Sequence, residues 1–120
     1  ATSTAALVVR DDSRVGIGTN APAEKLSVAG NVELTTAGNK LKIATGSDAS
    51  IGTATLVGGT VTVSTTAVAT GSKIFVSHNT VGGTPGILSA PDASIVNATS
   101  FVINSSSGTD TSTVNWWIIN

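Results

Sequence analysis

The stretch Val15-Gly-Ile-Gly-Thr-Asn-Ala-Pro-Ala-Glu-Lys-Leu-Ser-Val-Ala-Gly-Asn-Val-Glu-Leu34 decides how the chain can fold. Its apolar residues come in pairs two positions apart: Val15 and Ile17, Leu26 and Val28, Val32 and Leu34. This spacing predicts short, half-buried strands, with corners at the Gly, Asn and Pro residues and at most one helical turn, at Ala23–Leu26 after Pro22. Because a ribbon this short is marginal in water, we expect two further copies of the chain to cover it.

The segments on either side of this stretch continue its pattern. Ala6–Val9 is apolar, and Lys40–Ile43 alternates lysine with leucine and isoleucine. Alternation with one polar face predicts half-buried strands, and turn residues at 11–13 and 36–39 separate them. We therefore expect residues 1–46 to form a β stem.

Charged residues become scarce after the stem. In residues 51–120 only Lys73, Asp92 and Asp110 are charged, and over the whole chain the charged fraction is 11% and the aromatic fraction 3%. Ordinary soluble domains have roughly 25% charged residues, so a monomer with this surface would be poorly solvated. We expect a surface of Ser and Thr together with a large interface, and we place a domain boundary in the loop at 44–50.

Residues 51–120 show short β-branched segments divided by turn residues, which is typical of a sandwich or barrel. About 70 residues is small for a jelly-roll-like sandwich, and three such heads packed together would enlarge the core. The predicted strands are Thr53–Val57, Thr60–Thr65, Ser72–His78, Gly86–Ala90, Ala93–Asn97, Ser100–Ser105 and Thr113–Ile119.

Composition disfavours several classes of function. The chain has no cysteine, which removes disulfides, thiolate catalysis and zinc–cysteine sites. No apolar run approaches the roughly 18 residues of a membrane-spanning helix. A net charge of −1 gives no reason to expect nucleic acid or an anionic membrane as a partner. We expect no cofactor, no nucleic-acid partner and no membrane insertion.

One motif suggests a cofactor, but its context contradicts that reading. Gly16-Ile-Gly-Thr-Asn-Ala21 matches the G-x-G-x-x-A fingerprint of dinucleotide-binding proteins, which requires a helix directly after the glycines. Pro22 and the residues that follow predict no such helix. We interpret Gly16, Gly18 and Pro22 as structural corner residues.

The opening stretch, read from Val15 to Val32, resembles the V-G-I-G-T-x-x-P-x-x-K-L-x-V-x-G-N-I repeat of tailed-bacteriophage tail fibres and related trimeric adhesive spikes. Further segments resemble the C-terminal knob of such fibres, namely Gly52–Val68, Lys73–Val76, Ser100–Ser107 and Asp110–Ile119.

The resemblance implies an all-β, parallel homotrimer at the host-facing tip of a virion tail fibre, outside the cell. Residues 1–46 would form a short intertwined β stem, and residues 51–120 a jelly-roll-like β-sandwich head that ends the fibre at or near Asn120. Its partner would be a polysaccharide or an outer-surface protein of the host cell. Low charge suits such a trimer, because like residues meet at a three-fold axis.

Two loops are the main candidates for receptor binding. Residues 79–86 and 105–111 are rich in Gly, Ser, Thr and Asn, which gives adaptable hydrogen bonding, although plain hairpin loops have the same composition. The candidate receptor-binding residues are His78, Asn79, Thr80, Thr84, Ser106, Ser107, Thr109 and Trp117.

The adjacent tryptophans should point to opposite faces of the last strand. We expect Trp116 to fill the core with Val114 and Ile118. Trp117 would then lie outside with Asn115 and Ile119, packed against a neighbouring subunit or available as a platform on which a sugar stacks.

His78 is the only histidine, and alternation places it on the same face as Ile74 and Val76. It fits a structural role at the rim of the sheet or in an interface. The alternative is a metal or anion held on the three-fold axis by three copies of His78.

We expect no enzymatic activity, because the residues show no recognisable catalytic arrangement. Glycoside cleavage needs two carboxylates in a groove, and the head offers only Asp92 and Asp110, which we interpret as ordinary turn residues. Two alternatives to host attachment remain open. One is a purely structural trimerisation tip, and the other is a polysaccharide depolymerase with an intersubunit carboxylate site.

Overall fold

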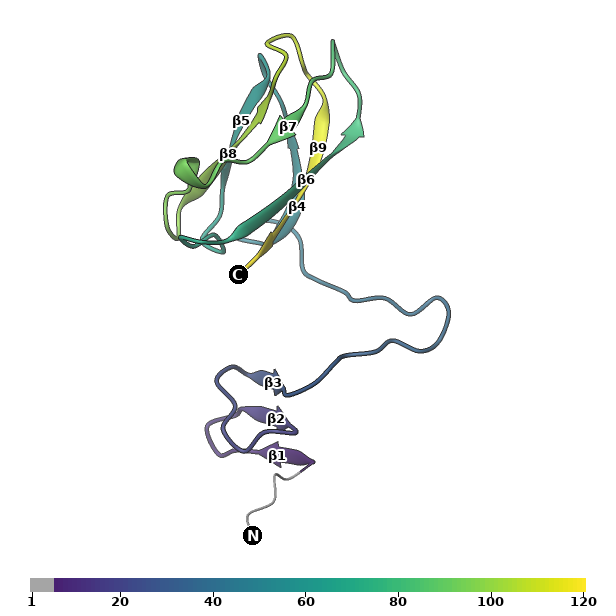
Figure 1. Ribbon diagram of the computed structural model, residues 1–120, viewed down its shortest axis with the longest axis vertical. Helices are drawn as coiled ribbons and strands as arrows, with labels where there is room; N and C mark the ends of the chain where they lie inside the picture. The colour runs from purple at the N-terminus through teal and green to yellow at the C-terminus, as the bar shows by residue number, and fades with distance from the viewer. Residues whose placement is uncertain (1–5) are drawn as a thin grey trace. The chain divides into compact units, whose positions relative to one another are not determined.

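The computed structural model describes residues 6–120, and the chain divides into two compact units, one ending at Leu41 and the other spanning Lys42–Asn120. The described residues form strands, turns and one 3₁₀ turn without an α-helix (Figure 1), which confirms the all-β prediction. No helix in this part of the chain is long and apolar enough to cross a membrane. The first five residues of the predicted stem lie outside the described range.

The first unit contains a three-stranded sheet at the positions that the period-two pattern predicts. Its strands are β1 (Leu7–Val9), β2 (Val15–Ile17) and β3 (Leu26–Val28). The order is β1-β2-β3, with β1 antiparallel and β3 parallel to β2.

The predicted corner residues have restricted surroundings. Gly16 and Pro22 are buried, and Gly18 has a φ of +69°, which favours glycine at this corner. A Cβ on Gly16 would collide with the carbonyl of Thr19.

Three segments of this part of the chain form no regular element. No helical turn forms at Ala23–Leu26, where at most one was predicted, because the hydroxyl of Ser27 accepts hydrogen bonds from the backbone N–H groups of Ala23 and Glu24. The segments at 32–34 and 40–43 pair with no other described segment of the single chain, and their pairing with further copies stays a prediction. Their side chains stay open to solvent, with Val32 73% and Leu41 70% exposed.

The second unit is a β-sandwich of two three-stranded sheets, and every strand pair in it is antiparallel. The two layers are visible in Figure 1. One sheet has the order β4 (Ile51–Thr55), β9 (Thr113–Ile119), β6 (Lys73–Thr80), and the other β5 (Thr60–Ser64), β8 (Ser100–Ser105), β7 (Leu88–Ser89). The predicted head at 51–120 lies within this unit, and its separation from a stem as a functional domain stays a prediction.

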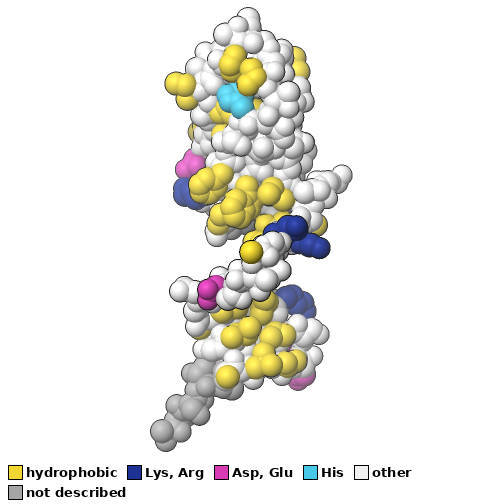
Figure 2. Space-filling model, turned by 90° about the vertical axis from the view of Figure 1, so that its right-hand side faces the viewer, with side chains coloured by type: hydrophobic (Ala, Val, Ile, Leu, Met, Phe, Trp, Pro, Cys, Tyr) yellow, Lys and Arg dark blue, Asp and Glu magenta, His cyan; other side chains and the backbone are white. Residues whose placement is uncertain are grey.

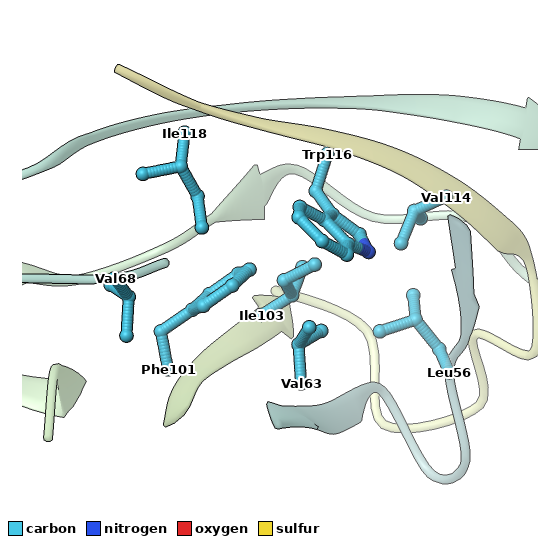
Figure 3. Close-up of a cluster of buried hydrophobic side chains, with 8 residues drawn as sticks. All are labelled: Leu56, Val63, Val68, Phe101, Ile103, Val114, Trp116 and Ile118. Atoms are coloured by element: carbon cyan, nitrogen blue, oxygen red, sulfur yellow. The ribbon is translucent and has the colours of Figure 1, made fainter. Parts of the chain in front are cut away.

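The core of the sandwich lies between the two sheets. Trp116 is only 5% exposed, and its ring meets that of Phe101 edge to face at a centroid distance of 5.5 Å (Figure 3). The prediction that Trp116 packs in the core with Val114 and Ile118 is confirmed. The buried hydrophobic cluster consists of Leu56, Val63, Val68, Phe101, Ile103, Val114, Trp116 and Ile118.

Elsewhere in the sandwich the observed elements correct the predicted ones. The segment at 93–97 is not a strand, because Asp92–Ser94 forms a 3₁₀ turn (η1) in which the Ser94 hydroxyl donates to the carbonyl of Pro91 at 2.7 Å. The strand predicted at 86–90 shortens to β7. Asn79 and Thr80 belong to β6 rather than to a loop, since Thr80 pairs with Thr113 across a β-bulge.

Candidate functional site

The outer face of the β4-β9-β6 sheet carries an apolar row at its centre. Ile51, Trp117 and Phe75 lie directly opposite one another on the three strands. Trp117 is 38% and Phe75 58% exposed, and their ring centroids are 6.3 Å apart at an interplanar angle of 44°. Figure 2 shows hydrophobic side chains gathered near the lower end of this unit, with an acidic and a basic side chain beside them. This exposed aromatic pair makes the sheet face a candidate contact surface.

A polar row lies next to the aromatic pair. Thr53, Asn115 and Ser77 face one another on the same three strands. The side-chain amide of Asn79 donates to the side-chain oxygen Oδ1 of Asn115 at 2.9 Å. The Thr80 hydroxyl in turn donates to Oδ1 of Asn79 at 3.1 Å. The Asn115 side chain thus accepts a bond through its oxygen and keeps its amide N–H groups as donors, on the same outward face of β9 as Trp117.

A cleft of about 470 Å³ lies over these two rows, within the range of sites for small ligands. Its walls come from all three strands of the sheet and from the segment that precedes β4. The lining residues are Thr45, Ile51, Gly52, Thr53, Phe75, Val76, Ser77, Asn115, Trp116 and Trp117.

Asp110 organises a separate cluster, in which the loops at the ends of β6, β7 and β8 meet. Its side chain is fully buried. One carboxylate oxygen accepts hydrogen bonds from the Ser105 hydroxyl at 2.6 Å and the Gly86 N–H at 3.0 Å, and the other from the Ser112 N–H at 2.9 Å. The bond from Ser105, with those from Ser112 and Gly86, holds the pKa of Asp110 well below its usual range. The interpretation of Asp110 as an ordinary turn residue is therefore wrong.

His78 belongs to the same cluster. Its Nε2 lies 3.4 Å from a carboxylate oxygen of Asp110, and its side chain is 27% exposed. It shares the inward face of β6 with Ile74 and Val76, as alternation predicted. The described residues contain no group of three or more His, Cys, Asp or Glu that could hold a metal ion. A metal held by three copies of His78 stays a prediction that a single chain does not test.

The structure divides the candidate receptor residues into two groups. Trp117, Asn79 and Thr80 share the outer face of the β4-β9-β6 sheet. The others lie around Asp110 and bond to their own loops: Ser106 accepts from the Ile87 N–H, the hydroxyls of Ser107 and Thr109 are 3.2 Å apart, and Thr84 N–H donates to the Thr109 carbonyl.

Sequence reasoning missed one member of the sheet face, Phe75, although alternation within its predicted strand could have placed it on the outward side. Asn115 shares the outward side of the last strand with Trp117, as alternation predicted. The signal was incomplete, however, because the pairing of Phe75 with Trp117 depends on the register between β6 and β9, which the sequence pattern of one strand does not contain.

Comparison with known proteins supplies a family for this sandwich. A family model described as the K1 capsule-specific polysaccharide lyase, C-terminal domain, matches residues 48–119, more than half of the chain. The chain belongs to this family. No curated protein and no solved structure matches. The match to the K1 lyase C-terminal domain includes every strand of both sheets and the whole cleft except Thr45. It supports a virion-associated phage tail protein, which is the broader part of the tail-fibre resemblance.

Proposed function

We propose that this member of the K1 lyase C-terminal domain family attaches a phage tail fibre to the host cell as a homotrimer, by binding a surface polysaccharide without cleaving it. The observation that carries the proposal is the exposed Trp117–Phe75 pair beside the Asn115 amide. The family description, which names a polysaccharide lyase, supports a polysaccharide over an outer-surface protein as the partner.

The chemistry of the sheet face suits a sugar ring. A sugar presents an apolar face of C–H groups, which an exposed indole can cover, and a rim of hydroxyls that needs donors and acceptors. The indole of Trp117 can cover the apolar face of the sugar. Hydrogen-bond donors and acceptors for the sugar hydroxyls come from Asn115, Ser77 and Thr53. None of these side chains is charged. A single such site is weak, and three sites per trimer would raise the affinity by avidity.

The depolymerase alternative is less well supported by the carboxylates. A substrate has no access to the fully buried side chain of Asp110, which already accepts three hydrogen bonds at 3.0 Å or less. Asp92 is exposed and forms an ion pair with Lys73 at 3.6 Å. We therefore propose binding without cleavage, and expect the chain to release no oligosaccharide from a capsule. Release that the exchange Asp92→Ala abolishes would establish the enzyme instead.

A structural trimerisation tip is the second candidate, favoured by the same apolar row. Ile51, Trp117 and Phe75 could pack against a neighbouring subunit as readily as against a sugar. The two functions differ in what the loss of Trp117 does. If Trp117 lies in a subunit interface, its loss changes the mass of the oligomer. If Trp117 stacks on a sugar, its loss changes only the binding of polysaccharide.

We expect Trp117→Ala to weaken polysaccharide binding at least tenfold, about 1.4 kcal/mol or more. The reason is that this exchange removes the stacking surface while leaving Asn115 in place. Binding of the full chain to an array of bacterial capsular polysaccharides measures the effect, and Trp117→Phe should retain part of the affinity.

Ser107→Ala is the matched control, because Ser107 lies in the loops around Asp110 and not on the sheet face. Light scattering checks that neither exchange changes the mass. Equal affinity for Trp117→Ala and the unchanged chain would overturn the assignment of this face.

A further inference from the structure

The two sheets of the sandwich each end in one protected and one unprotected edge strand. The edge strand β6 carries Lys73 and a β-bulge between His78 and Thr80, and β7 has only two residues. Charges, bulges and short length are the features that keep an edge strand from pairing with another chain. The opposite edges, β4 and β5, have none of them: each is five residues long and contains no charge, no proline and no recorded shift of register.

The backbone of β5 has hydrogen-bonding groups that point away from its own sheet. At one end the Gly59 carbonyl accepts from the Ser105 N–H, and at the other the Thr65 N–H donates to the Thr99 carbonyl. Odd-numbered residues of β5 therefore face β8, and alternation turns the N–H and C=O groups of Thr62 and Ser64 outward. No turn or loop among the described residues bonds to these outward groups.

The segment before β4 borders this region, since Thr45, Gly46 and Ser47 line a second cleft together with residues of β4 and β5. This segment is fixed beyond the end of β5 by two bonds, from the Thr65 hydroxyl to the Ala49 carbonyl at 2.8 Å and from the Thr66 N–H to the Asp48 carboxylate at 3.1 Å. Neither bond involves the outward backbone groups of Thr62 or Ser64.

The second cleft lies along this open edge and has a volume of about 600 Å³. Small side chains and glycines line most of it, which leaves room for an extended backbone to approach β5. Its lining residues are Thr45, Gly46, Ser47, Gly52, Thr53, Ala54, Thr62, Val63, Ser64 and Trp116.

We propose that an extended segment of a second copy of this chain enters the second cleft and adds as a strand to the β5 edge at Thr62 and Ser64. The inference rests on the homotrimer of the proposed function and names the surface that joins its subunits. Strand addition satisfies the outward backbone groups of Thr62 and Ser64, and cyclic symmetry repeats the same contact in every subunit.

A second copy is the favoured occupant because the chain contains strand-forming segments that lack partners. Residues 32–34 and 40–43 have the period-two pattern of strands but form no ladder within the described chain. Three of their apolar side chains, Val32, Leu34 and Leu41, are 52–73% exposed. Backbone pairing with β5 does not depend on side-chain charge, and alternation allows the charged residues of such a segment to face solvent while its apolar residues face the sandwich.

The test is the mass of the full chain in solution, measured by light scattering over a range of concentrations. We expect the unchanged chain to be oligomeric, and Thr62→Lys and Thr62→Pro each to raise the dissociation constant at least tenfold. Thr62 is exposed and its N–H faces outward, so proline removes no bond to β8. Thr62→Val, which keeps the backbone groups, and Ser89→Lys, on the protected β7 edge, should leave the mass unchanged.

Circular dichroism of each variant shows whether the sandwich is folded, and amide hydrogen exchange gives an independent readout. In the oligomer the N–H groups of Thr62 and Ser64 should exchange slowly, and dilution to the monomer should release them. A monomeric unchanged chain, or an oligomer that Thr62→Pro leaves intact, would overturn the inference. So would an oligomer that dissociates on Trp117→Ala instead.

Failure of this inference and failure of the proposed function are distinguishable. Thr62 lies outside the cleft that contains Trp117. If Thr62→Pro leaves the oligomer intact while Trp117→Ala abolishes polysaccharide binding, only the strand-addition interface is wrong. If Thr62→Pro gives monomers and no chain binds polysaccharide, the interface is correct and the attachment site is wrong.

Discussion

Trp116→Ala should lower the free energy of unfolding by about 3–5 kcal/mol, the range for truncating a large buried aromatic side chain. The ring of Trp116 lies between the two sheets and packs on Phe101, with 5% of the residue exposed. A sandwich of this size has only about 5–15 kcal/mol of stability in total. Urea unfolding of the full chain, followed by circular dichroism, measures the loss.

Trp117→Ala is the control for that experiment, because it removes the same side chain from the outer side of the same strand. Its cost should be about 1 kcal/mol, the scale of a cross-strand contact such as the one with Phe75. Equal losses for the two exchanges would contradict the assignment of Trp116 to the core.

Trp116→Phe provides a variant that keeps the fold if the alanine variant does not. The Trp116 Nε1 is buried without a hydrogen-bond partner, so the exchange to phenylalanine breaks no hydrogen bond and should cost less than the exchange to alanine. Gly52 belongs to the same arrangement, since a Cβ there would lie 2.7 Å from the indole ring of Trp116.

The parts of the fold that the sequence predicted are those that depend on local pattern. Alternation along Thr113–Ile119 was enough to place Trp116 inside and Trp117 outside, because the side chains of a strand point alternately to its two faces. The strand at Ser100–Ser105 was predicted with its observed bounds for the same reason.

The differences between prediction and structure occur where a distant group decides the local structure. Residues 40–43 alternate as a strand does, yet they have no partner within the described chain. At 93–97 the hydroxyl of Ser94 bonds back to Pro91 and also accepts from the N–H of Val102, which favours a 3₁₀ turn over a strand. Neither the missing partner of residues 40–43 nor the hydrogen bonds of Ser94 can be read from the apolar pattern.

The candidate site shows the same division between local and long-range information. Trp117 was a candidate on its own, because one exposed tryptophan stands out in a chain that is 3% aromatic. Its partners Phe75 and Asn79 come from a strand about forty residues away and are brought to it by the register of β6 against β9. The cluster around Asp110 likewise joins the β6–β7 and β8–β9 loops, which no sequence motif connects.

Asp110→Asn should destabilise the sandwich more than Asp92→Asn does, and the two differ in their dependence on pH. Asp110 is fully buried and bonded to Ser105, Gly86 and Ser112, whereas the side chain of Asp92 is 73% exposed. Loss of the charge weakens all three bonds to Asp110, and the asparagine amide also brings two donors to a site in which the backbone N–H groups of Gly86 and Ser112 point at the carboxylate. Thermal unfolding of the full chain between pH 2 and 7 measures both effects.

The direction of the pH effect follows from the lowered pKa of Asp110. In the unfolded chain this carboxyl titrates near its ordinary value of 3.8, and in the folded chain it titrates well below that value. Between the two values the unfolded state binds more protons, so the stability contributed by Asp110 is complete above about pH 4–5 and is lost as the pH falls further. The unchanged chain should therefore lose stability steeply below pH 4, and Asp110→Asn should be less stable at neutral pH but nearly flat across the acid range. An Asp110→Asn chain with the same acid slope as the unchanged chain would show that another carboxyl controls the transition.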